Sequence, residues 1–452
     1  HKQDWGVELE IIAPPGWRVA TGMEPTGPLA YRATDYEEFI DCPLQAGNFA
    51  LAEFDVDGVR YEIVYEGATA FDPQYLAAPL EAVVTTVSDL WGKPPLSRYV
   101  FMYLETDAGF LNGLEHRNST IITGPVTDPQ LLSGLIGMSM HEFFHLWNVK
   151  RLRPVGFGPF DYTKEAHTTA LWVAEGLTEY YTDLLMMRAG FHSAETYLAG
   201  VANYVQQLEN MPGRHNMSIE EASWTTWHFG DDRWNGALNY YVKGYLVGVA
   251  LDLELRGRSD NQVTLDDVMR AMWDAYGATG IAYDPKDVCQ MAEKLLGEDL
   301  EEFWSRYLRG KEDFDWDRLL AHAGLELRVR DAVAILQVVP KPVEGGLRLE
   351  NVVAGGAAQE AGLQIGDVLV AVGDRRATTA LLADLRGYHK PGDEVEVTYF
   401  RRDRLFRCPV KLGKQAHYTI VPDPKATPAQ FALRADWLAP LFARADTVAP
   451  RA

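Results

Sequence analysis

Hydrophobic and polar positions follow two different periods along this chain, and the change of period divides it into regions. Residues 1–68 contain short stretches of period two, such as VELEII and VRYEIVYEG, between turns that contain Pro and Gly. This period places alternate side chains on opposite faces of a strand. Residues 1–68 are therefore predicted to form an N-terminal β-sheet domain.

From Asp72 onward the apolar residues recur every three or four positions, which is typical of amphipathic helices. The stretch 98–124 interrupts this pattern and predicts two strands joined by a Gly-containing loop, the second strand being LEHRNSTII. Three residues are predicted N-caps of the later helices: Ser193, Thr264 and Asp284. We assign residues 69–325 to one domain, which combines these helices with the strands of 98–124.

The last third of the chain has short strands, one helix and Gly-rich turns, and residues 326–413 are assigned to a third domain. In the remaining segment, residues 414–452, the stretch ATPAQFALRADWLAPLF predicts a helix that docks on the body. The whole chain is therefore predicted to be an α+β protein of several domains. Its first residues, HKQDWG, look like the middle of a β domain, so we expect that domain to be incomplete, with more sequence before it in the natural protein.

One motif in the second region points to metal chemistry. The segment MSMHEFFHLWNVKRLRP keeps helical spacing until Pro154 and places His141 and His145 one turn apart on the same face. Two imidazoles at this spacing can bind one metal ion, and Glu142 can act as a base on a metal-bound water. The alternative is a chance His-Glu-x-x-His pattern on an ordinary helix. Three polar residues in one patch of an apolar helix favour the metal site.

A catalytic zinc site needs a third protein ligand. The next helical stretch, residues 167–190, has an apolar body that Glu175 and Glu179 interrupt on one face. We assign Glu175 as the third ligand and Glu179 as the carboxylate that holds the far nitrogen of a ligand histidine. Asp183 is a further candidate for this second role. The competing interpretation is that both glutamates lie on a solvated face.

Four motifs together carry a resemblance to a known family: GLEHRNS, HEFFHLWNVKRLRP, LWVAEGLTEYY and NYYVKGYLVGVALDLELR. Their order resembles that of the zinc glycyl aminopeptidases that carry a PDZ domain, which are relatives of the gluzincin aminopeptidases. The resemblance extends over nearly the whole chain. It implies a thermolysin-like catalytic domain, one zinc ion bound by His141, His145 and Glu175, and Glu142 as the general base.

The same resemblance assigns substrate-binding residues. Glu115, with Gly113 beside it, matches a glutamate that recognises the free amino terminus of the substrate, and Tyr241 matches a tyrosine that stabilises the oxyanion. Asn112 departs from the family pattern, which often has a glycine there. An edge strand at Glu115 would pair with substrate main chain, and its carboxylate would bind an ammonium group strongly. Physical reasoning alone leaves a plain surface glutamate open and does not separate Tyr241 from Tyr240.

The segment AAQEAGLQIGDVLVAVG, residues 357–373, resembles PDZ domains of the bacterial type. Such domains bind extended chains at a strand edge and hold a terminal carboxylate in a glycine-containing loop. The resemblance places this loop at Gly346, Leu347 and Leu349, although Arg348 stands where many PDZ domains have a glycine. Binding of a peptide ligand and a role as a packing module both stay open.

Composition limits the remaining possibilities. The net charge of −22 argues against nucleic acid and against an anionic membrane surface as partners. Cys42, Cys289 and Cys408 predict neither a disulfide framework nor a cysteine metal site. No apolar run reaches the roughly 18 residues of a membrane span, so none is predicted. The sequence leaves cytoplasmic and periplasmic locations both open.

Three functions compete for this chain. The first, implied by the resemblance, is a zinc aminopeptidase that removes small residues such as Gly or Ala from peptides with a free N-terminus. The second is a zinc endopeptidase, which would cleave blocked peptides and be indifferent to Glu115. The third is a PDZ peptide-binding protein with an inert zinc site. The complete set of His141, Glu142, His145 and Glu175 argues against the third function.

Overall fold

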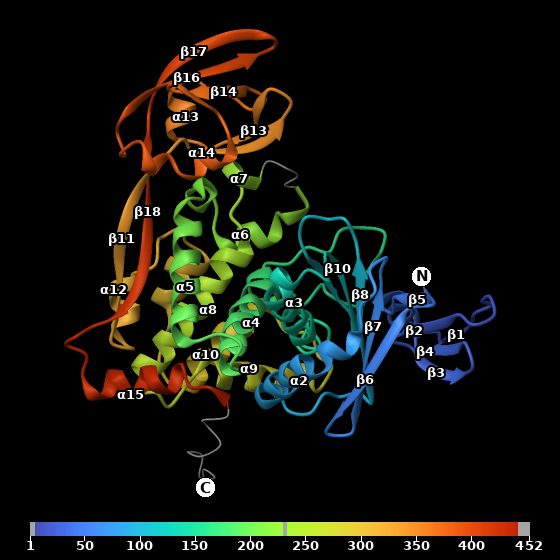
Figure 1. The fold of residues 1–452 in the computed structure, drawn as a ribbon. Helices are drawn as coiled ribbons and strands as arrows, with labels where there is room; N and C mark the ends of the chain where they lie inside the picture. The colour runs from blue at the N-terminus through green and yellow to red at the C-terminus, as the bar shows by residue number, and fades with distance from the viewer. Residues whose placement is uncertain (1–4, 229–232, 442–452) are drawn as a thin grey trace.

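The computed structural model describes residues 5–228 and 233–441 of the chain. Figure 1 shows N-terminal strands on one side, a helical body in the centre, and a β-rich domain that stands on a two-stranded ribbon above the body. The predicted first and last segments extend into residues 1–4 and 442–452, which lie outside the described residues. The α+β class and the organisation into several domains are confirmed.

The N-terminal strands form two small sheets. One has the order β1-β4-β3, and the other pairs β2 with β5 in antiparallel orientation. The elements are β1 (Val7–Glu10), β2 (Arg18–Thr21), β3 (Glu24–Gly27), β4 (Ala30–Ala33), α1 (Tyr36–Asp41) and β5 (Leu44–Gly47). Met23 and Tyr31 are among the buried side chains that fill this part.

A five-stranded sheet of order β6-β7-β8-β10-β9 follows. Its strands are β6 (Ala50–Val56), β7 (Val59–Glu66), β8 (Arg98–Glu105), β9 (Asn112–Glu115) and β10 (Ser119–Gly124). Strands β7 and β8 are parallel, and helix α2 (Ala77–Trp91) connects them. Our boundary after residue 68 therefore divides one sheet. The β6–β7 hairpin has a local Asp57-Gly58 turn signal, whereas its pairing with β8 across a helix leaves no local signal.

The stretch LEHRNSTII, predicted as one strand, is a hairpin. Strand β9 runs antiparallel to β10, and the His116 N–H donates to the Ser119 carbonyl at the turn (2.9 Å). The Arg117 N–H donates to the carboxylate of Asp41 (2.7 Å), which holds the turn from outside. In the sheet order β9 lies at one edge, the position expected for the strand that carries Glu115.

The helical body surrounds α8, in which every residue from Val242 to Arg256 is buried. Its α-helices are α3 (Leu132–Phe144), α4 (Thr178–Arg188), α5 (Ala194–Glu209), α6 (Ile219–Trp224), α7 (Arg233–Gly236), α8 (Tyr240–Arg258), α9 (Leu265–Met272), α10 (Pro285–Leu296), α11 (Glu301–Phe303) and α12 (Trp316–Ala321). Three π-helical turns are η3 (Trp172–Leu177), η6 (Trp273–Gly277) and η7 (Trp304–Leu308). Short 3-10 turns are η1 (Pro73–Leu76), η2 (Pro129–Leu131), η4 (Pro212–His215) and η5 (Thr226–His228). The N-caps predicted at Ser193, Thr264 and Asp284 are confirmed by side-chain hydrogen bonds.

The third domain has its own sheet and its own apolar core, which includes Leu349 and Val397. Its elements are β12 (Val338–Val343), β13 (Gly346–Val352), α13 (Ala357–Glu360), β14 (Val368–Val372), β15 (Arg375–Arg376), α14 (Thr379–Ala383), η8 (Leu385–Gly387), β16 (Glu394–Arg401) and β17 (Arg404–Lys411). The ribbon of β11 (Leu325–Ile335) and β18 (Gly413–Pro422) joins this domain to the helical body (Figure 1). The segment after residue 413 therefore begins as a strand and not as a tail. Across the described residues, no helix combines the length and apolar composition that crossing a bilayer requires.

The helix predicted near the C-terminus is α15 (Pro428–Trp437). Its Trp437 side chain is buried, with its ring centroid 5.7 Å from that of Tyr197 in α5. This packing docks α15 on the helical body, as the apolar positions of the sequence predicted.

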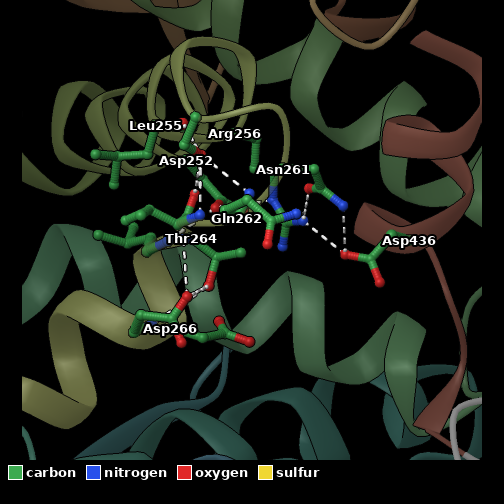
Figure 2. A network of polar contacts seen from close by, with 12 residues as sticks. Asp252, Leu255, Arg256, Asn261, Gln262, Thr264, Asp266 and Asp436 are labelled. Carbon is green, nitrogen blue, oxygen red and sulfur yellow. Dashed lines mark hydrogen bonds and ion pairs between the residues drawn. The ribbon is translucent and has the colours of Figure 1, made fainter. Parts of the chain in front are cut away.

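A buried polar network joins the same helix to α8 (Figure 2). The Arg256 guanidinium donates to Asp252 (3.0 Å) on its own helix and to Asp436 (2.8 Å) of α15. Asp252 also accepts from the Leu265 N–H (2.9 Å) at the start of α9. Since Asp252 is fully buried, its charge depends on the buried guanidinium of Arg256 for compensation.

Replacing Arg256→Met should lower the free energy of unfolding by about 3 kcal/mol or more, because Asp252 would stay buried without its cationic partner. Arg309→Met is the control, since Arg309 and its partner Glu301 are 49% and 63% exposed. The control should lose less than about 1 kcal/mol. Denaturant unfolding of both variants provides the measurement, and equal losses would contradict the network's importance.

Candidate metal centre

Helix α3 positions the first two histidines. It carries His141 in its last turn and ends at Phe144, with His145 as its C-cap. The prediction that the helix continues to Pro154 was wrong. The His145 Nδ1–H donates to the Asn148 carbonyl (2.7 Å), and the Arg151 guanidinium donates to the Leu146 carbonyl (3.0 Å). Side chains thus satisfy groups that a further helical turn would have used.

Glu175 reaches the histidines from the π-helical turn η3. Its Oε2 atom lies 3.5 Å from His141 Nε2 and 3.3 Å from His145 Nε2. The Asn148 side-chain amide donates to the Val173 carbonyl (2.8 Å) and so fixes this wide turn. π-Helical turns are frequent at functional sites, and here the turn presents the carboxylate.

The distances from the Glu175 carboxylate to the two histidine nitrogens fit a tetrahedral metal ion. Ligands about 2.1 Å from zinc at tetrahedral angles lie about 3.4 Å apart, which is close to the observed separations of 3.3 and 3.5 Å. Burial opposes ionisation of Glu175, but His145 and His141 lower the pKa of this carboxyl well below its usual range. His141, His145 and Glu175 thus form a group that could hold a metal ion.

Outer partners orient these ligands. The Glu179 carboxylate lies 3.1 Å from His141 Nδ1, the nitrogen that faces away from Glu175. Tyr204 donates to the same carboxylate from α5. Asp183 was wrong as a candidate for this role, because it accepts from Tyr245 (2.7 Å) instead. Asn148 and Tyr204 were not predicted. Asn148 is the polar residue within the apolar run LWNV that follows His145, which was the available signal for it.

Glu142 lies next to this group and is buried. Its Oε2 atom has no hydrogen-bond partner among the described residues, and burial raises the pKa of this carboxyl to about 7. Gly113 of β9 lies directly against it, since a Cβ atom at this position would overlap the Glu142 carboxylate. The glycine therefore lets the edge strand approach the side chain that the sequence assigned as a base.

Glu115 lies on the same side of the site. One carboxylate oxygen of Glu115 is within 4.8 Å of donor atoms of Glu142 and His145. Glu115 and Glu175 also line a cavity of about 780 Å³ that extends toward α1 of the N-terminal domain. The cavity thus joins the predicted amine-recognition residue to the metal centre.

Tyr241 lies in the first turn of α8, which Asn239 caps. Gly176 of η3 and Gly244 of α8 touch, so that a Cβ atom on Gly244 would lie 2.7 Å from the Gly176 Cα. This close crossing brings α8 against the turn that carries Glu175. Burial, followed by the negative charge of Glu175, raises the pKa of Tyr241. The hydroxyl of Tyr240 accepts from Thr226 (3.4 Å).

The predicted carboxylate-binding loop of the third domain was wrong. Gly346, Leu347 and Leu349 lie in β13, which pairs with β12 on one side and with β14 on the other. Leu347 and Leu349 are buried in the core of this domain. The Gly345-Gly346 pair, which looked like a binding loop, marks the tight turn between β12 and β13.

Family comparisons match three parts of the chain. Residues 134–247 match the family model of the M61 glycyl aminopeptidases, and residues 1–48 match the peptidase M61 N-terminal domain. Residues 326–412 match a PDZ domain. These matches confirm both predicted resemblances.

One solved structure shows the same fold over nearly the whole chain. An aminopeptidase N family protein from Idiomarina loihiensis is 28% identical, with a TM-score of 0.87 over 97% of this chain and 80% of its own. An M1 zinc metallopeptidase from Deinococcus radiodurans is 14% identical, with a TM-score of 0.47 over 68% of this chain and 64% of its own. Among curated proteins, the serine protease Do-like HtrA of Lactococcus lactis is 39% identical over 77 residues, which are 17% of this chain and 19% of its own length.

Gly113→Ala should lower kcat for peptide hydrolysis about a hundredfold, because the added methyl group displaces the Glu142 carboxylate. Gly109→Ala is the matched control in the preceding loop, where a Cβ atom meets nothing within 4 Å. Steady-state kinetics and thermal melts of both variants provide the measurement. Unchanged kcat in folded Gly113→Ala would show that the contact with Glu142 does not matter.

Proposed function

This chain is a member of the M61 glycyl aminopeptidase family and hence a peptidase, and we propose that it is a zinc-dependent aminopeptidase. It releases small N-terminal residues, Gly or Ala, from peptides with a free amino terminus. The position of Glu115 carries this proposal, since its carboxylate lies within 4.8 Å of donor atoms of Glu142 and His145. The preference for Gly or Ala rests on the family description.

The short distance between Glu115 and Glu142 favours cleavage after one residue. In an N-terminal residue the amine nitrogen and the carbonyl carbon are separated by the Cα atom alone, about 2.5 Å apart. An ammonium group bound at Glu115 therefore places the first peptide bond beside Glu142. A longer N-terminal extension would meet the Glu115 carboxylate and the edge strand β9.

His141, His145 and Glu175 are the residues that would hold zinc. When bound, zinc supplies a Lewis acid that lowers the pKa of a water molecule and polarises the scissile carbonyl. Glu179 and the Asn148 carbonyl each accept from a histidine Nδ1–H, which leaves both Nε2 atoms facing Glu175.

Glu142 and Tyr241 would carry the proton and charge movements. The Glu142 Oε2 atom, which has no partner among the described residues, takes the proton of the attacking water and passes it to the leaving amine. The Tyr241 hydroxyl donates to the oxygen of the scissile carbonyl as negative charge develops on it. A tyrosine with a raised pKa stays protonated and can therefore donate.

Two alternatives predict different behaviour. An endopeptidase would need an open cleft on the amine side, where this chain has Glu115. A binding protein with an inert site would not need donor atoms at zinc-ligand spacing together with a buried carboxylate beside them.

For the PDZ domain we infer a packing role. Strand addition needs N–H groups on a free edge, and among the described strands β12 is one edge of this sheet. Pro340 and Pro342 have no N–H, and because β12 keeps its pairing with β13 they face the free side. Asn235 of the helical body meanwhile donates to the Val352 carbonyl (2.8 Å) and accepts from the Ala354 N–H (2.8 Å). These contacts hold the domain against the body.

The test of the function compares glycyl- or alanyl-arylamide with its N-acetylated form. Only the free-amine substrate should be hydrolysed, because Glu115 binds an ammonium group. A chelator should abolish turnover and added zinc should restore it. Hydrolysis of the acetylated substrate would support the endopeptidase, and a folded, zinc-loaded protein inactive on both would support the binding protein.

Tyr241→Phe should lower kcat about a hundredfold or more with little change in KM, because the hydroxyl acts on charge that develops after binding. Tyr240→Phe is the matched control, since its hydroxyl contacts Thr226. Its kcat should stay within about threefold of the wild type. A larger loss in Tyr240→Phe than in Tyr241→Phe would reverse the assignment.

A further inference from the structure

An ion pair between Lys150 and Asp41 lies next to Glu115, the proposed amine-recognition residue. The Lys150 ammonium lies 2.7 Å from Asp41 Oδ1 and 4.0 Å from Glu115 Oε1. All three residues line the cavity that also contains Glu175. Lys150 thus lies between two carboxylates and is closer to the one that has no part in the proposed chemistry.

The three side chains come from three separate segments. Asp41 is the last residue of α1 in the N-terminal domain, Lys150 follows the ligand helix, and Glu115 ends strand β9. Their side chains are only 19–22% exposed. In such a partly buried place charges interact more strongly than on an open surface. Whether Lys150 pairs with Asp41 or with Glu115 therefore changes the binding free energy of a cation at Glu115.

Contacts with the β9–β10 hairpin hold the Asp41 carboxylate in place. It accepts from the Arg117 N–H (2.7 Å) at the tip of the β9–β10 hairpin and lies 3.5 Å from His116 Nδ1. Burial opposes its ionisation, but contacts with His116 and Lys150 lower the pKa of Asp41. The carboxylate is therefore an anion at neutral pH and attracts Lys150.

A lysine paired with Glu115 would compete with the substrate. Its ammonium group has the same charge and the same hydrogen-bond donors as the amino terminus of a peptide. Because Lys150 is tethered beside Glu115, its effective concentration there would be on the order of millimolar or higher. Without a competing anion, Lys150 would occupy the substrate's place.

We propose that Asp41 is a positioning residue for substrate recognition: it holds Lys150 away from Glu115 and so keeps that carboxylate available to the ammonium group of the substrate. The inference rests on the proposed function of Glu115. It gives the N-terminal domain a direct part in substrate selection, through one carboxylate that never touches the scissile bond.

The test is a double-mutant cycle of Asp41→Asn and Lys150→Met in the zinc-loaded full chain. Asn keeps a side-chain oxygen that can accept from the Arg117 N–H, while it removes the charge. Asp41→Asn alone should raise KM for alanyl-arylamide about tenfold and leave kcat within about threefold, the pattern of lost binding. In the Lys150→Met background, the same change should alter KM less than about twofold.

The affinity for a ligand that cannot be hydrolysed gives a second measurement. Alaninol keeps the ammonium group and has no scissile bond, so its dissociation constant, measured by calorimetry, should rise in Asp41→Asn by the same factor as KM. Thermal melts establish that each variant is folded. Added salt should weaken the Lys150–Glu115 pair and so reduce the defect of Asp41→Asn.

Two outcomes would overturn the inference. An equal rise of KM in both backgrounds would mean that Asp41 acts on the shape of the hairpin and not through Lys150. An unchanged KM and an unchanged alaninol affinity in Asp41→Asn would mean that Lys150 does not compete at Glu115. Failure of the proposed function is visible separately, because the wild type would then not distinguish alanyl-arylamide from its acetylated form.

Discussion

The site depends on holding three ionisable side chains around one point inside the protein. The side chains of His141, His145 and Glu175 are 12%, 2% and 18% exposed, and isolated charges at such depth would strongly destabilise the fold. Here each has fixed partners: the carboxylate faces both imidazoles, while Glu179 and the Asn148 carbonyl hold their far nitrogens. Glu142 Oε2, in contrast, is a buried oxygen with no hydrogen-bond partner among the described residues, and it belongs to the residue that we propose as the general base.

This arrangement needs main chains to approach more closely than side chains normally allow. Gly176 and Gly244 permit α8 to cross directly over the π-helical turn that carries Glu175. Gly113 does the same for the edge strand beside Glu142. In each case a single methyl group would overlap atoms of the site. The positions of the charged groups therefore depend on the glycines, which have no side chain, as much as on the contacts between side chains.

How much of the fold and of the site the sequence predicts depends on whether the signal is local or lies in contacts between distant segments. His141, His145, Glu175 and Glu179 could be assigned because helical spacing is a local property of the chain. The end of α3 at Phe144 could not be predicted in this way, because it depends on how Asn148 and Arg151 fold back on the end of the helix. The placement of β6 and β7 beside β8 also depends on distant segments.

The misplaced PDZ loop has a different cause from the missed long-range contacts. Leu347 and Leu349 alternate with polar residues as in a strand, and a Gly-Gly pair comes directly before them. The turn signal was real, but it belongs to the β12–β13 hairpin. The pattern of leucines was therefore the better guide, since two buried side chains on one face of a strand constrain the backbone more than two glycines do. One edge of the sheet is consequently β12, where Pro340 and Pro342 remove N–H groups that an added strand would need.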